Sequence, residues 1–261
     1  MSQASEIFND PKLLEQLKSL MQEADSAILD VYHSSDLGEQ IKENNSPVTQ
    51  ADLATHQILV KGLTKLTPKI PVVSEEDNNS LNIPNEHSIY WLIDPLDGTK
   101  EFINRNDEFT CNLALIENNT TTLGFVTVPV RGELYFGGQG LGASLRTTSG
   151  TESPIRYQNK PGVTRIVASK SHLNEDTRAF IDRQEGTIEL IQAGSSLKFL
   201  KIATGEADLY PRLAPTCEWD TAAAQAVLEG AGGKVLQAEN LTPLRYGKKN
   251  ILNPHFIACA N

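Results

Sequence analysis

A short apolar run that ends in two carboxylates constrains the fold of this chain more than any other feature. The run Ile89–Ile93 has strand character and leads directly into the sequence DPLDGT at residues 94–99. The rigid ring of Pro95 fixes the turn, so both aspartates and the Leu96 carbonyl can point into one space. The apolar lead-in indicates half-buried carboxylates, which need a cation or hydrogen-bond partners. Hard divalent cations such as Mg²⁺ prefer oxygen ligands of this kind.

The residues after the second carboxylate suit a phosphate group. Beyond Gly98, backbone N–H groups at a helix start can bind a phosphate, with the hydroxyl of Thr99 alongside. A tight turn without any ligand is the alternative interpretation of residues 94–99.

Two further segments carry acidic side chains that suit a metal ion. Glu75-Glu76-Asp77 follows the strand-like run 71–74, and Asp220 stands at the start of a predicted helix over 220–229. A solvated loop also accounts for the first segment. A simple helix N-cap also accounts for Asp220.

Two other acidic motifs fail on spacing. A calcium EF-hand loop needs acidic or Asn residues at alternating positions, but the alternates after Asp94 are Leu96 and Gly98. A covalent aspartyl-phosphate enzyme of the Asp-x-Asp-Gly-Thr type needs its nucleophile two residues before Asp97, where this chain has Pro95. The spacing therefore favours direct attack by a metal-activated water.

The charge balance limits the partners. Lys and Arg number 23 against 33 Asp and Glu, a formal net charge of -10, in a chain with 39% hydrophobic residues. Such a surface repels nucleic-acid polymers and anionic membranes. A small phosphorylated substrate stays compatible, because bound metal ions reverse the sign of the field inside one cleft.

Cysteine usage and the terminus predict a cytoplasmic protein. Cys111, Cys217 and Cys259 are widely spaced, which suggests neither zinc nor a redox dithiol and fits a reducing compartment. Residues 1–6 have neither the basic nor the apolar region of a signal peptide. No apolar run is long enough to predict a transmembrane segment.

Periodicity predicts an α+β arrangement for the first half. Asp10-Pro11 is a typical helix start, and apolar residues then recur at helical spacing for about six turns. Residues 34–47 are polar and predicted to form a loop, and a second helix around 54–63 ends before Pro68. Strand-like runs follow at 71–74, 89–93, 110–117, 121–129 and 132–137. The last three predict an antiparallel meander.

The second half changes rhythm and predicts an α/β layer. Strands at 165–168, 188–191 and 207–210 alternate with helices near 175–184, 195–204 and 220–229. The change falls near 150–162. We therefore expect an α+β subdomain at residues 1–155 that contains the antiparallel sheet and most metal ligands. An α/β subdomain at residues 156–261 would complete the site and bind a nucleotide.

Together these segments resemble a known family. An acidic loop, then Asp-Pro-Leu-Asp-Gly-Thr, then Trp219-Asp220 before an alanine-rich helix is the pattern of the inositol monophosphatase superfamily. Its members are lithium-sensitive, magnesium-dependent phosphatases. The resemblance spans nearly the whole chain, from the N-terminal helix to Asn253-Pro254. It implies a layered αβαβα sandwich with the site between the two halves.

Within the superfamily the chain looks most like the bacterial 3'(2'),5'-bisphosphate nucleotidases of the CysQ type. The inositol branch has Thr-Asn-Phe where this chain has Lys100-Glu101-Phe102. Glu218 is expected to affect the rim of the pocket. The segments that carry the likeness are residues 45–52, 74–77, 97–102, 194–199, 209–212 and 219–223.

The resemblance implies roles for specific residues. Asp52 and Thr99 would form a hydrogen-bonded pair that orients the attacking water, although a helix-start charge also accounts for Asp52. Gly98 and Thr99 would contact the phosphate that is removed. Two or three Mg²⁺ ions would be bound by one carbonyl and four carboxylates: Leu96, Glu75, Asp94, Asp97 and Asp220.

The implied substrate is adenosine 3',5'-bisphosphate (PAP), cleaved to AMP and phosphate, and the sulfated nucleotide PAPS is a second candidate. This activity clears a by-product of sulfate assimilation. Lys198 and Arg212 would bind the phosphate that stays, although a solvated lysine and a surface arginine are the alternatives. The remaining substrate contacts would come from the residues that bind the metal and the leaving phosphate, together with Gly194, Ser195, Ser196 and His172. A capping or surface histidine is the alternative interpretation of His172.

Two alternatives remain open at this stage. An inositol or sugar phosphate phosphatase has the same fold, although Lys100-Glu101-Phe102 argues against it. A non-catalytic protein that senses metal or nucleotide is the alternative from another class. The sequence leaves open a monomer or a homodimer, and peripheral association with the inner membrane.

Overall fold

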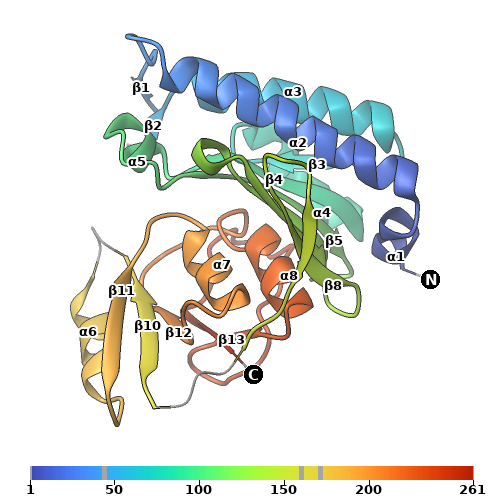
Figure 1. Cartoon of the computed structure of the whole chain (residues 1–261). Helices are drawn as coiled ribbons and strands as arrows, with labels where there is room; N and C mark the ends of the chain where they lie inside the picture. Colours follow the sequence, from blue (N-terminus) through green and yellow to red (C-terminus); the bar gives the residue numbers. More distant parts are fainter. Residues whose placement is uncertain (1, 43–45, 159–161, 170–172, 261) are drawn as a thin grey trace.

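The computed structural model describes residues 2–42, 46–158, 162–169 and 173–260. These residues form stacked layers in the order helices, sheet, helices, sheet, helix (Figure 1). The mixed α/β fold and the αβαβα layer order that the resemblance implied are therefore confirmed.

The first layer consists of one short helix and two long helices that cover one face of the larger sheet. They are α1 (Gln3–Phe8), α2 (Pro11–Tyr32) and α3 (Gln50–Leu66). The Asp10 carboxylate accepts the N–H groups of Lys12 and Leu13, so the predicted cap of α2 is confirmed. The buried stripe of α2 packs on the sheet and includes Leu17, Met21, Ala24 and Ile28.

The prediction of a loop over residues 34–47 is wrong in part. Gln40–Ile41 (β1) pairs with Pro47–Val48 (β2) as a short antiparallel hairpin. Strands of two residues are too short for a detectable alternation of polar and apolar side chains.

The larger sheet has seven strands in the order β3-β4-β5-β6-β7-β8-β9. Its first pair is parallel and all later pairs are antiparallel, so the predicted meander is confirmed. The last two strands were missed, because their sequences are polar and only partly buried. The bounds are Val72–Ser74, Ile89–Asp97, Thr110–Glu117, Thr120–Val128, Glu133–Gly138, Gly142–Arg146 and Glu152–Ile155.

Strand β4 delivers the main acidic motif. It continues to Asp97 instead of ending at Asp94, and its pairing with β5 shifts register between these two residues. Pro95 lies inside this irregular section, where a missing N–H costs the ladder little. Short helices η1 (Asn78–Asn82) and α4 (Ile83–Glu86) connect β3 to β4.

The smaller sheet has five strands in the order β11-β10-β12-β14-β13. The first three strands are parallel to each other, as the predicted α/β alternation requires. The last two strands were missed; β14 pairs antiparallel with β12, and β13 pairs antiparallel with β14. Their bounds in chain order are Thr164–Ala168, Ile188–Gln192, Leu209–Arg212, Lys234–Gln237 and Phe256–Cys259. The helices of this half are α6 (Glu175–Asp182), α7 (Leu197–Ala203) and α8 (Ala222–Gly230).

Helix α8 joins the two halves into one core. A Cβ atom at Gly124 of β6 would lie 2.2 Å from the carbonyl oxygen of Ala223, so the helix and the strand touch through backbone. Small side chains on both surfaces permit this approach. One buried apolar cluster consequently includes residues of both sheets. Sheet membership changes between Ile155 and Thr164, and the division into subdomains at residues 155 and 156 stays a prediction.

Among the helices in the described ranges, none combines the length and the apolar character that a membrane crossing requires.

Candidate active site

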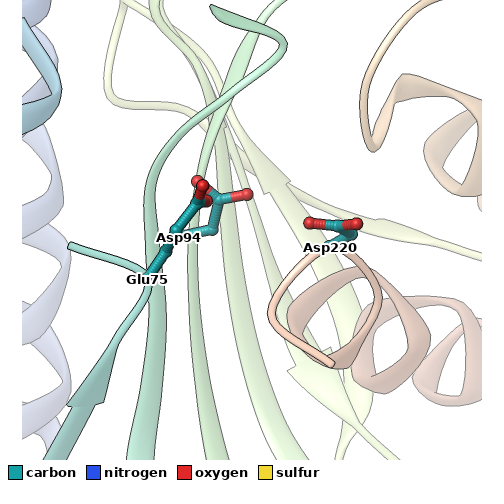
Figure 2. A group of neighbouring side chains, drawn as sticks. All are labelled: Glu75, Asp94 and Asp220. Atoms are coloured by element: carbon teal, nitrogen blue, oxygen red, sulfur yellow. The ribbon is translucent and has the colours of Figure 1, made fainter. Parts of the chain in front are cut away.

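Three carboxylates from distant parts of the chain meet at one point. Glu75 follows β3, Asp94 belongs to β4, and Asp220 precedes α8. One oxygen of each lies within 4.8 Å of the others. Glu75 and Asp94 lie side by side, and Asp220 faces them from the opposite half of the molecule (Figure 2). The fold therefore brings together three of the four carboxylates that were predicted to bind metal.

This cluster is electrostatically unfavourable on its own. Burial and the neighbouring charges of Glu75, Asp97 and Asp220 hold the pKa of Asp94 well above its usual value. Burial also raises the pKa of Glu75 to about 7 and that of Asp220 to about 8. Converging, buried carboxylates repel each other unless a cation or a proton joins them. The donor set, all hard oxygens, fits a divalent cation such as Mg²⁺.

A lysine beside the cluster was missed from the sequence. Lys42 lies next to β1. Its Nζ is 3.0 Å from Oε1 of Glu75 and 2.6 Å from Oε1 of Glu76. Within the acidic loop, Glu76 is thus ion-paired and Asp77 caps η1 through the N–H of Asn79, so only Glu75 joins the cluster. The signal for Lys42 is absent from the sequence because the lysine stands 33 residues before Glu75.

Asp97, the fourth predicted metal ligand, lies beside the cluster rather than in it. Its Oδ2 accepts the hydroxyl of Ser195 at 2.6 Å and that of Ser196 at 3.0 Å. Among the described residues, the hydrogen bonds to Asp97 all end on this one oxygen. The arrangement leaves Oδ1 available, and it holds the hydroxyls of both serines against a carboxylate.

The turn after Asp97 has the geometry that the motif predicts. Gly98 adopts φ 92°, and a Cβ there would lie 3.2 Å from the carbonyl oxygen of Glu108, so a larger residue would be strained. Thr99 then begins the short helix α5 (Thr99–Ile103). Asp94 accepts the N–H of Leu96, and the Leu96 carbonyl lies 3.3 Å from the Thr99 hydroxyl.

Asp52 satisfies both interpretations that the sequence left open. Its Oδ2 accepts the N–H and the hydroxyl of Thr49, which completes a capping box at the start of α3. Its Oδ1 lies 3.3 Å from the hydroxyl of Thr99. Burial raises the pKa of Asp52 to about 6. The expected pair with Thr99 is therefore present in the structure.

The helix-cap interpretation of Asp220 is wrong. Thr221 is the N-cap of α8, and the Asp220 carboxylate accepts the N–H of Cys217 at 2.8 Å instead of any helical N–H. The carboxylate therefore bonds back within its own turn and keeps its position at the cluster.

A pocket of about 140 Å³ opens next to Asp97 and Asp220. Nζ of Lys198 donates to the carbonyl of Ser195, and burial lowers the pKa of Lys198 to about 8. Nη2 of Arg212 donates to Pro215, and its buried Nε has no partner among the described residues. The lining residues include Asp97, Gly98, Gly194, Ser195, Lys198, Arg212 and Asp220. His172, the remaining predicted contact, lies outside the described residues.

The prediction that Glu218 affects the rim of this pocket is wrong. The side chain of Glu218 is only 1% exposed and accepts hydrogen bonds from Gly247 and Lys248. It is not among the residues that line the pocket.

The chain resembles known proteins over nearly its full length. Residues 10–259 match the model of the inositol monophosphatase family. The 3'(2'),5'-bisphosphate nucleotidase CysQ of Salmonella typhimurium is 40% identical over 246 residues, which cover 94% of this chain and 98% of that protein. The protein of the same name from Escherichia coli K12 is 40% identical over 247 residues, with the same coverage.

A solved structure agrees with these sequence matches. The crystal structure of CysQ from Bacteroides thetaiotaomicron, described as a bacterial member of the inositol monophosphatase family, is 37% identical to this chain. It superimposes with a TM-score of 0.86 and covers 97% of this chain and 98% of its own.

Proposed function

The chain belongs to the inositol monophosphatase family, and from this membership we propose that it is a 3'(2'),5'-bisphosphate nucleotidase. It removes the 3'-phosphate of adenosine 3',5'-bisphosphate and releases AMP and phosphate, which clears a by-product of sulfur assimilation; PAPS is a second candidate substrate. The observation that carries the proposal is the 40% identity over 94% of the chain to curated nucleotidases of this name. Its three free cysteines support a reducing compartment, the cytoplasm.

In this proposal the acidic cluster would hold two or three Mg²⁺ ions. The residues that would bind them are Glu75, Asp94 and Asp220, together with Asp97 and the Leu96 carbonyl. When bound, such ions neutralise the charge of a phosphate ester and lower the pKa of a water molecule. The mutual repulsion of the buried carboxylates supports a site built for cations.

Thr99 and Asp52 orient the attacking water. The Thr99 hydroxyl has one proton and can donate it either to Asp52 or to the Leu96 carbonyl. Donation to Asp52 turns the lone pairs of Thr99 toward the water, which fixes its direction of approach. Because the pKa of Asp52 is about 6, its carboxylate is charged at neutral pH and is the stronger acceptor.

The pocket beside Asp97 binds the remainder of the nucleotide. Gly98 and Thr99 contact the phosphate that leaves, and residues 194–196 lie against the substrate. Arg212 binds the phosphate that stays, a role supported by its buried, unpartnered Nε among the described residues. Lys198 adds a second positive charge at the same wall.

A phosphate-release assay tests the proposal. The purified protein is given PAP, PAPS and inositol 1-phosphate in turn, each with Mg²⁺ and with a chelator, and an Asp94→Asn variant controls for contaminating phosphatases. We expect Mg²⁺-dependent release with the highest kcat/KM on PAP. A higher kcat/KM on inositol 1-phosphate would instead identify an inositol phosphatase, and no release on any ester would indicate a binding protein.

A further inference from the structure

Glu218 is a buried carboxylate whose partners lie far along the chain. It accepts hydrogen bonds from the backbone N–H groups of Gly247 at 2.7 Å and Lys248 at 3.0 Å, and it also forms an ion pair with the Lys248 ammonium. With three donors and 1% exposure, this side chain is held in one orientation. Since Glu218 is two residues from Asp220, whatever fixes Glu218 also fixes the turn that contains the cluster carboxylate.

The segment that holds Glu218 is itself attached to the larger sheet. Tyr246 donates its N–H to the carbonyl of Asn119, and the Asn119 amide donates back to the carbonyl of Tyr246 at 2.7 Å. Asn119 stands in the turn between β5 and β6, and β5 pairs directly with the strand that carries Asp94. A chain of hydrogen bonds thus connects the sheet of Asp94 to the turn of Asp220.

A second contact braces the same turn from the other side. The amide of Asn253 donates to the carbonyl of Cys217 at 2.7 Å and to the hydroxyl of Thr221 at 3.0 Å. The Asp220 carboxylate accepts the N–H of Cys217. Residues on both sides of Asp220 are therefore fixed by the segment 245–253.

The bracing opposes a force that the cluster creates. Asp220 faces the charges of Asp97 and Glu75, and like charges in a buried site repel each other. An unbraced turn would relax away from the cluster whenever no cation is bound, and the cost of bringing it back would reduce the affinity for the metal.

We propose that Glu218, held by Lys248 and Gly247, is a positioning residue that keeps Asp220 within reach of Glu75 and Asp94 and thereby sets the affinity for the metal. The inference rests on the proposed metal site. It assigns Glu218 no contact with the nucleotide.

The test measures Mg²⁺ binding without substrate. Calorimetric titration of the metal-free protein with Mg²⁺, together with the rise in Tm on Mg²⁺ addition, is compared between wild type and Glu218→Gln. We expect the Kd for Mg²⁺ to increase at least tenfold and the rise in Tm to shrink. The KM for PAP at saturating Mg²⁺ should stay within twofold of wild type. An unchanged Kd would overturn the proposal.

Two further variants keep the test decisive. Lys248→Met removes the ammonium but leaves both backbone donors, so its Kd should increase two- to fivefold, and an unchanged Kd there overturns the proposal if Glu218→Gln does not fold. Asp208→Asn is the matched control, because it breaks a partly buried ion pair with Arg165 in the same half of the molecule. It should lower Tm without changing the Kd for Mg²⁺.

The outcome for the metal is separable from the outcome for the substrate. If wild type releases no phosphate from PAP but Glu218→Gln still weakens Mg²⁺ binding, the proposed substrate is wrong and the positioning role stands. A wild-type protein that binds no Mg²⁺ overturns both the metal site and the role of Glu218.

Discussion

The hydroxyl oxygen of Thr99 lies 3.3 Å from Oδ1 of Asp52, while Oδ2 of the same carboxylate caps helix α3 through Thr49. One side chain thus contributes to the stability of a helix and to the geometry of the site. Any experiment on Asp52 must therefore separate a loss of stability from a loss of chemistry.

We predict that Asp52→Asn and Thr99→Ala each lower kcat about a hundredfold or more while KM for PAP changes less than threefold. The reason is that both residues direct one water, while the backbone N–H groups after Gly98 that contact the phosphate are kept in both variants. The double variant should be hardly slower than either single variant, because the two groups act as a unit. Steady-state kinetics of the three variants measures this, and strictly additive losses would show two separate roles.

Asp10→Ala is the control for stability in that experiment. It removes the cap of α2, worth about 1 kcal/mol, at an exposed position away from the site. It should lower the free energy of unfolding about as much as Asp52→Asn does, with kcat unchanged.

We predict opposite effects of Asp94→Asn on activity and on metal-free stability. Turnover at saturating Mg²⁺ should decrease at least a hundredfold, as it should for Asp220→Asn, because a ligand charge is lost. The metal-free protein should become about 1 kcal/mol more stable, because the mutual repulsion in the buried cluster is reduced. Kinetics and urea denaturation in chelator measure the two effects, and near-normal activity in both variants would contradict the ligand assignment.

We predict that the metal-free protein loses stability as the pH rises from about 5 to 8. In the folded chain Glu75 and Asp220 hold their protons up to a pKa of about 7 and about 8, against ordinary values of 4.5 and 3.8. At pH values between the unfolded and the folded pKa of each group, the folded state binds more protons than the unfolded state, so each pH increase favours unfolding. Urea denaturation in chelator at several pH values measures this.

The same groups make metal binding dependent on pH. A cation must displace their protons, so the Kd for Mg²⁺ should decrease as the pH rises from 6 to 8. In saturating Mg²⁺ the decline in stability should disappear. A metal-free stability that stays flat across this range would show that the cluster carboxylates are already ionised.

We predict that Arg212→Ala and Lys198→Ala differ in selectivity. Arg212→Ala should lower kcat/KM on PAP at least tenfold more than on adenosine 3'-monophosphate, which lacks the second phosphate. Lys198→Ala should reduce kcat/KM on both substrates, because Lys198 also donates a hydrogen bond to the carbonyl of Ser195, whose hydroxyl donates to Asp97. Parallel kinetics on the two substrates measures this, and equal losses for Arg212→Ala would remove it from the second phosphate site.

Local structure was predictable from short stretches of sequence. The turn at residues 94–99, the helix start after Gly98 and the cap at Asp10 each depend on interactions between residues a few positions apart. Strands β8 and β9 were not predicted, because their sequences are polar and only partly buried. Strands β13 and β14 were not predicted, because pairing with strands distant in sequence stabilises them more than their own composition does.

The sequence by itself determined which groups are available: the acidic motifs, their order and the residues that fix each turn. Only the tertiary structure decided which of them meet. Asp220 joins Glu75 and Asp94, Lys42 pairs with Glu75, and Asp97 bonds a serine 98 positions away. The physical reason is range, since backbone sterics and capping act over a few residues. Distances across the site are instead set by the packing of one half on the other, at contacts as close as that of Gly124 with α8.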